Sequence, residues 1–214
     1  MNYIENIYVC IAAPIIIAVL CTRGNRKMSM LFVLGGMTAC LLSSYISTFI
    51  AAVSGVDFQE ASLSISPVVE EVMKLLPILF YLLVFEPPAG KAAGCTLMVA
   101  VGFATFENIC YLTENGASSV INLIIRGFGT GTMHVLCGVI LAIGMVRLWD
   151  KIWLRVAGII GLLALAINYH AVFNLLVSQG GKLAFIGLVV PILSTVFWLL
   201  FRDKIYPERE PHRD

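Results

Sequence analysis

Two adjacent glutamates, Glu70 and Glu71, interrupt an otherwise apolar stretch of the chain. The segment that begins at Ser66 reads SPVVEEVMKLLP, and it continues into ILFYLLVF, which is as apolar as any other part of the sequence. An ionisable side chain in the hydrocarbon of a membrane costs about 2.5–3.5 kcal/mol even on lenient insertion scales. Glu70, Glu71 and Lys74 therefore need a structural or chemical reason to lie there.

Composition places the chain among integral membrane proteins. Its 214 residues are 59% hydrophobic and 13% charged, and the mean hydropathy is +0.93. Soluble domains carry about 25% charged residues on average. We therefore predict an all-α fold, a polytopic transmembrane helix bundle in a lipid bilayer. The sequence contains no basic patch of the kind that would indicate nucleic acid as a partner.

A spanning helix needs about 20 predominantly apolar residues. About seven segments meet this requirement, near 4–21, 29–53, 66–85, 94–113, 120–147, 152–177 and 183–201. The connectors are short, so we expect a single transmembrane domain over 1–204, with its functional core in 66–177. The remaining residues, 205–214, contain two prolines and little to bury, and we expect a disordered cytoplasmic tail.

The distribution of basic residues predicts the orientation in the membrane. Most lysines and arginines fall in the odd-numbered connectors and in the C-terminal tail, whereas the even-numbered connectors hold only Lys182. We therefore predict that the N-terminus lies outside and that the C-terminus is cytoplasmic. Lys74 and Arg126 are exceptions, because both lie inside predicted helices.

The third predicted helix carries the acidic pair near its outer end. Ser66 as N-cap and Pro67 at the first helical position are a good start signal, which puts Glu70 and Glu71 about one turn inside. Lys74 follows at i+4 and i+3, so it can reach either carboxylate. A structural ion pair is one interpretation. One lysine cannot neutralise two adjacent carboxylates, however, and this favours acid–base chemistry.

Further polar residues lie on the next three predicted helices, namely Glu107, Asn108, Arg126, His134, His170 and Asn174. At 1.5 Å per residue, the four residues Glu70, Glu71, Glu107 and His170 fall within about two turns of the outer surface, with His134 one or two turns deeper. Each could be a structural residue alone, and Arg126 could reach the interface by snorkelling. Burying the whole group would cost roughly 10 kcal/mol, which favours a shared cavity that opens outward.

The order of these motifs resembles the PrsW family of bacterial intramembrane proteases. The motifs of this chain, on successive predicted helices, are Glu70-Glu71-x-x-Lys74, Phe103-x-x-x-Glu107-Asn108, His134 and His170-x-x-x-Asn174. The PrsW family is related to the CAAX prenyl endopeptidases and the bacteriocin-processing membrane proteases. Lys74 and the Glu107-Asn108 pair favour the PrsW branch over the CAAX branch. Asn174 is a mild departure, because PrsW-like proteins often have Asp there.

The resemblance implies a multi-pass protease of the bacterial cell membrane that cleaves a membrane-anchored protein near the outer face. The substrate implied is a single-pass anti-sigma factor, whose first-site cleavage releases a sigma factor under envelope stress. A CAAX-type or bacteriocin-processing peptidase is an alternative. A proton-coupled transporter and a partner-binding membrane scaffold are the alternatives that are not enzymes.

For the chemistry we favour a glutamate mechanism without a cofactor. In this hypothesis Glu70 activates water, while Glu71 and Lys74 set its charge state. His170 and Asn174 position water or donate to the oxyanion, and Glu107 and His134 orient the neighbouring groups or shuttle protons. Asn108 and Arg126 are supporting residues. Zinc held by Glu70, Glu107, His134 and His170 is the rival, although Lys74 would compete with a cation and no HExxH motif is present.

Overall fold

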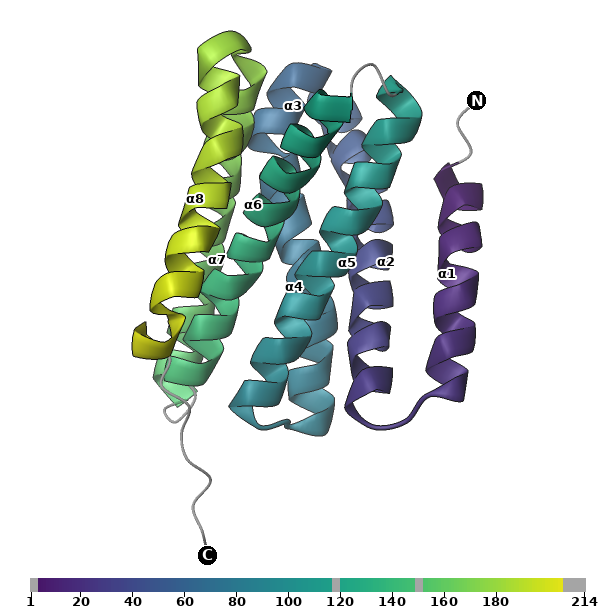
Figure 1. The fold of residues 1–214 in the computed structure, drawn as a ribbon, viewed down its shortest axis with the longest axis vertical. Helices are drawn as coiled ribbons and strands as arrows, with labels where there is room; N and C mark the ends of the chain where they lie inside the picture. The colour runs from purple at the N-terminus through teal and green to yellow at the C-terminus, as the bar shows by residue number, and fades with distance from the viewer. Residues whose placement is uncertain (1–3, 117–119, 149–151, 206–214) are drawn as a thin grey trace, which may run out of the picture.

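The chain folds into a bundle of α-helices (Figure 1). The computed structural model describes residues 4–116, 120–148 and 152–205, and all regular secondary structure in these ranges is helical. The helices are α1 (Ile4–Cys21), α2 (Asn25–Ser54), α3 (Phe58–Ser64), α4 (Ser66–Phe85), α5 (Ala89–Asn115), α6 (Val120–Arg147), α7 (Ile152–Ser178) and α8 (Gly181–Ile205). The prediction of an all-α bundle is confirmed.

Every predicted span corresponds to one helix, and the bounds of α1, α4 and α6 agree with the predicted ones. Among the described residues, six helices are long and apolar enough to cross a membrane: α1, α2, α5, α6, α7 and α8. The remaining long helix, α4, is too charged to belong to this set, because it carries Glu70, Glu71 and Lys74 within 20 residues. The chain is a multi-pass membrane protein, and a seventh span at α4 stays a prediction.

The helix α3 lies in a stretch that we expected to be a connector. It begins at an N-cap, Asp57, whose side chain accepts a hydrogen bond from the backbone N–H of Glu60. The predicted N-cap role of Ser66 is wrong. Ile65 keeps a right-handed helical conformation between α3 and α4, so that Ser66 is already inside the helix and Ile65 takes the cap position. The α3 helix therefore leads almost directly into the acidic pair.

Close packing of α2 against α5 fixes the centre of the bundle. A Cβ atom added to Gly36 would lie 2.0 Å from the carbonyl oxygen of Val99, and one added to Gly102 would lie 2.0 Å from that of Val33. Because only glycine leaves this space, the two backbones approach more closely than ordinary side chains allow. Phe103 and Phe106 of α5 are fully buried beside this contact.

The two ends of the bundle differ in charge. The α1–α2 connector, which contains Arg23, and the start of α5, which contains Lys91, lie at one end, whereas α3 and the N-terminal end of α1 lie at the other (Figure 1). The orientation prediction requires these basic segments to lie at the same end of the bundle, as they do. The orientation in the membrane itself stays a prediction. Of the predicted disordered tail, 205–214, residue 205 ends α8 and 206–214 lie outside the described residues.

Candidate active site

The two glutamates of α4 point to different surroundings. The side chain of Glu71 is 1% exposed, whereas that of Glu70 is 19% exposed. Successive residues of a helix are rotated by about 100°, because one turn takes 3.6 residues. Glu71 therefore faces the interior of the bundle while Glu70 faces a cavity. The sequence placed both glutamates in one site, and the structure gives them different degrees of burial.

Lys74 and Glu71 form a buried ion pair one turn apart on α4. The ammonium nitrogen of Lys74 lies 2.6 Å from Oε1 of Glu71. The same nitrogen lies 3.0 Å from Nδ1 of His134 on α6 and 4.8 Å from the centre of the Phe103 ring. Lys74 thus links α4 to α6 and α5. Of the two carboxylates that it could reach by spacing, Glu71 is the one that it binds.

His170 of α7 contacts both glutamates. Its Nδ1 atom lies 2.9 Å from Oε1 of Glu71, and its Nε2 atom lies 3.7 Å from Oε2 of Glu70. The His170 ring also meets the His134 ring edge to face, with 5.0 Å between the ring centres. One imidazole therefore connects the buried ion pair to the carboxylate at the cavity.

Glu107 of α5 is held between a histidine and an arginine. Its Oε2 atom is in a short contact with Nε2 of His134. Its Oε1 atom lies 3.5 Å from the guanidinium of Arg126, which also donates to the side-chain oxygen of Asn108 at 2.7 Å. The Arg126 guanidinium stacks on the ring of Tyr111 at 3.5 Å. Arg126 is thus tied to three residues of α5.

Asn174 of α7 has a different setting. Its amide nitrogen donates a hydrogen bond of 2.9 Å to the carbonyl oxygen of Ser62, which lies in α3. This contact attaches α3 to α7 beside the cluster. The predicted catalytic residues Glu70, Glu71, Glu107, His134 and His170 are joined in one chain of contacts with Lys74, and Asn174 supports the helix next to them.

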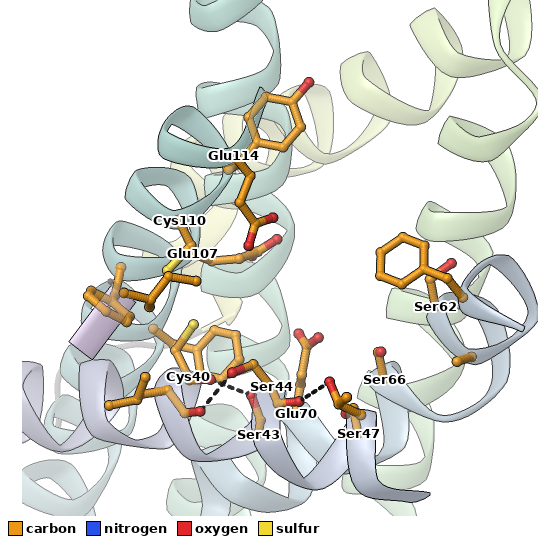
Figure 2. A pocket seen from close by; sticks show the side chains of 18 of the residues that line it. Cys40, Ser43, Ser44, Ser47, Ser62, Ser66, Glu70, Glu107, Cys110 and Glu114 are labelled. Atoms are coloured by element: carbon orange, nitrogen blue, oxygen red, sulfur yellow. Dashed lines mark hydrogen bonds between the residues drawn. The ribbon is translucent and has the colours of Figure 1, made fainter. Parts of the chain in front are cut away.

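A cavity of about 750 Å³ opens beside this cluster, between α2, α3, α4, α5 and α6. Figure 2 shows Glu70 and Glu107 in this cavity, above serines of α2. Glu71, Lys74, His134 and His170 do not line it, and each of them is at most 5% exposed. The cavity therefore gives access to the two carboxylates, with the two histidines directly behind them.

The residues that α2 and α3 contribute to the site were not predicted from the sequence. Hydroxyl residues of α2 line the cavity, among them Ser43, Ser44, Ser47 and Thr48. Their spacing of i, i+1, i+4 and i+5 puts them on one face of a helix, and a polar stripe in an apolar span is a readable signal. The start of α3 also has a sequence signal, because Asp57 and Glu60 have the spacing of the N-cap and third residue in a capping box.

The contacts determine where the protons of both histidines lie. An ammonium group only donates, so Nδ1 of His134 accepts from Lys74 and its Nε2 carries the hydrogen toward Glu107. A carboxylate only accepts, so Nδ1 of His170 donates to Glu71, and in the neutral imidazole its Nε2 is left as an acceptor. Oε2 of Glu70 and Nε2 of His170 are therefore two acceptors that face each other.

The residue types and spacing at this point also suit a metal ion. Glu70, His134 and His170 each offer one ligand atom, and these atoms lie within 4.8 Å of one another. One carboxylate and two imidazoles are a known catalytic zinc set. Glu107, the fourth residue of the predicted zinc set, is not in this group.

The neighbouring ammonium opposes a metal ion. Ligation through Nδ1 of His134 would place the cation beside Lys74, which is 3.0 Å from that atom. Ligation through Nε2 would require a hydrogen on Nδ1, and this hydrogen would face the same ammonium. Zinc therefore fits the three donors but not the proton arrangement that Lys74 imposes on His134.

Comparison with known proteins gives one match. The model of a family described as PrsW family intramembrane metalloprotease matches residues 24–201, which is most of the chain. No curated protein matches, and no solved structure matches. The matched range contains the whole cluster and α2, while α1 lies outside it.

Proposed function

Because the chain belongs to the PrsW family of intramembrane proteases, we propose that it hydrolyses a peptide bond of a membrane-anchored protein in the cavity lined by Glu70 and Glu107. The family match supports the protease activity, and the cavity supports the place. The proposed substrate is a single-pass anti-sigma factor, cut near the extracytoplasmic face of a bacterial cell membrane. This substrate and this membrane rest on the resemblance of the motifs to the PrsW family.

The observation that carries the proposed chemistry is the pair of facing acceptors, Oε2 of Glu70 and Nε2 of His170, 3.7 Å apart. A polar contact of this length suits a bridging water, which can donate one hydrogen to each acceptor. Such a water would be oriented next to a base at the edge of the cavity. Glu70 is the proposed general base, and His170 is the proposed second acceptor that positions the water.

The reaction then proceeds in two steps. Glu70 takes a proton from the water while the water oxygen bonds to the carbonyl carbon of the substrate. This gives a tetrahedral intermediate. The carboxylic acid of Glu70 next gives this proton to the amide nitrogen, and the carbon–nitrogen bond breaks. The products are a carboxylic acid and an amine, so water is the only co-reactant.

The other members of the cluster would set charge and orientation. Glu71 and Lys74 neutralise each other in the interior, and Glu71 holds the tautomer of His170. His134 and Arg126 hold Glu107 at the cavity, where its negative charge favours proton uptake by Glu70 during the first step. Asn174 remains the proposed oxyanion donor through the amide hydrogen that Ser62 does not use.

A zinc-dependent form of the same protease is the second candidate. The three donor atoms within 4.8 Å favour it, as does the description of the family as a metalloprotease. Glu70, His134 and His170 would hold the ion, which would supply a metal-activated water. We favour the glutamate mechanism because the ammonium group of Lys74, 3.0 Å from Nδ1 of His134, opposes a cation at this point.

A cleavage assay tests the proposed function. A single-pass protein of the anti-sigma type is incubated with the wild type and with Glu70→Gln in lipid vesicles, and the fragments are separated by size. We expect cutting by the wild type and a loss of about 10²–10⁴-fold in the Glu70→Gln variant, the usual contribution of a general base. Equal cutting by both would remove Glu70 from catalysis.

A further inference from the structure

One wall of the cavity is built almost entirely of small side chains. It lies on α2 and consists of Ser43, Ser44, Ser47, Thr48, Ala51 and Ala52, which we call the α2 wall. On the facing side, α3 and the start of α4 add Ala61, Ser62 and Ser66. Figure 2 shows the serines of the wall below Glu70, with Ser62 and Ser66 to one side. Small residues therefore line the cavity on both sides near Glu70, together with Phe58 of α3.

The hydroxyl groups of the α2 wall are not equivalent. Ser43 and Ser44 donate to backbone carbonyls one turn earlier, at 2.8 Å each, and Thr48 donates to the carbonyl of Ser44 at 2.8 Å. Ser47 differs, because its hydroxyl has no hydrogen-bond partner among the described residues although the residue is only 8% exposed. Buried hydroxyl groups are normally paired with protein or ordered water, so this one is open to a water or to a bound molecule.

A protease substrate in a membrane supplies partners of the right kind. A helical segment satisfies its main-chain groups internally, but a segment that presents a peptide bond to water must be extended around that bond. Extension frees main-chain N–H and C=O groups of the substrate in an apolar environment. The protease must then supply hydrogen-bond partners for them. A serine hydroxyl can both donate to a carbonyl oxygen and accept from an N–H group.

We propose that the α2 wall binds the extended main chain of the substrate beside Glu70, with the hydroxyl of Ser47 hydrogen-bonded to a substrate peptide group. This inference rests on the proposed function, since it assigns the substrate surface of the same site. A main chain within hydrogen-bond distance of Ser47 leaves little room on the α2 side. The substrate residues that face α2 are therefore small, of the size of glycine, alanine or serine.

Photo-crosslinking tests this surface without requiring cleavage. The Glu70→Gln variant carries a benzoylphenylalanine in place of Thr48, which lines the cavity, or in place of Phe49, which is 68% exposed on another face of α2. The probes are two synthetic single-span peptides in lipid vesicles. They differ in four residues of the outer third, which are Ala-Ser-Gly-Ala in one and Leu-Phe-Ile-Leu in the other.

We expect the small-residue peptide to give at least about tenfold more adduct at position 48 than the bulky peptide, the range by which a close-fitting pocket rejects added carbon atoms. Position 49 should not distinguish the peptides. Ser47→Ala should lower the adduct at position 48 by about fivefold, the value of one hydrogen bond. Ser44→Ala is the matched control, because that hydroxyl is already paired within α2.

Equal adduct from both peptides, equal adduct at both positions, or no adduct at position 48 would overturn the inference. So would equal effects of Ser47→Ala and Ser44→Ala. The same peptides are then incubated with the enzyme that retains Glu70. If the crosslinking pattern appears but the bound peptide is not cut, the binding surface stands and the proposed hydrolysis at Glu70 fails.

Discussion

The ammonium nitrogen of Lys74 lies 3.0 Å from Nδ1 of His134, in the buried part of the site. This contact directs the hydrogen of His134 toward Glu107, and the partner of Lys74, Glu71, directs the hydrogen of His170 away from Glu70. Two buried charges thus set the proton arrangement around the cavity without lining it. The division explains why two adjacent glutamates can occupy one helix in a membrane protein: Glu71 is paired internally, and Glu70 is left for chemistry.

The first prediction separates the two glutamates by stability. Glu71→Gln should lower the free energy of unfolding by about 3–5 kcal/mol, because it leaves Lys74 buried without its counter-charge. Glu70→Gln changes only the 3.7 Å contact with His170 and leaves Lys74 paired, so it should change stability by less than about 1 kcal/mol. Thermal unfolding in one detergent measures both, with Glu60→Gln on exposed α3 as the control. Equal loss in the two variants would contradict the division of roles.

The second prediction concerns coupling between Lys74 and Glu71. Lys74→Met alone should destabilise the protein by about 3–5 kcal/mol, since Glu71 then becomes the unpaired buried charge. The double variant, Lys74→Met with Glu71→Gln, should be more stable than the sum of the two single effects predicts, by about 1–3 kcal/mol. A double-mutant cycle by thermal unfolding measures this. Additive effects would mean that the two side chains act independently.

The third prediction tests the close approach of α2 and α5. Gly102→Ala should lower the free energy of unfolding by about 1–3 kcal/mol, because its new methyl group would meet the Val33 backbone. Gly94→Ala, on the same helix, is the matched control: a Cβ atom there has no neighbour within 4 Å. This control should be neutral or stabilising by up to about 1 kcal/mol, since alanine favours helix over glycine. If both variants behave alike, α2 and α5 do not need glycine at position 102 to pack closely.

The fourth prediction concerns the link between α3 and α7. Asn174→Asp replaces the amide donor by an acceptor opposite the carbonyl oxygen of Ser62, so the hydrogen bond is lost and two oxygens face each other. We expect a loss of about 1–3 kcal/mol, the cost of an unpaired polar group. Faster limited proteolysis of the connector at 55–57 would locate the effect in α3. Unchanged proteolysis would argue against attachment of α3 by Asn174.

Much of this arrangement follows from the sequence alone. Backbone groups in a membrane must be paired internally, so long apolar segments become helices, and the bounds of α1, α4 and α6 agree with those predicted. A depth count along these helices was enough to bring Glu70, Glu107 and His170 to one level. The helix α3 was missed because it is short and lies outside the apolar segments, where hydropathy carries no signal.

The rotation of each helix about its own axis could not be predicted. Depth places Glu70 and Glu71 at one level but does not say which of them faces Lys74, His170 or the cavity. The serine stripe of α2 can be read from its spacing, but the sequence does not say that this face meets Glu70 or that the Ser47 hydroxyl has no partner. These features depend on which neighbour each helix face meets, and only the packed structure contains that information.

The most direct test of the glutamate mechanism is a joint measurement of zinc content and cleavage. The protein is purified without a histidine tag, its metal content is determined, and cutting of a single-pass substrate is followed before and after treatment with a chelator. For the glutamate mechanism we expect zinc well below one ion per chain and cleavage that survives chelation but is lost in Glu70→Gln. Stoichiometric zinc, with activity that disappears on its removal and returns when zinc is added back, would contradict it.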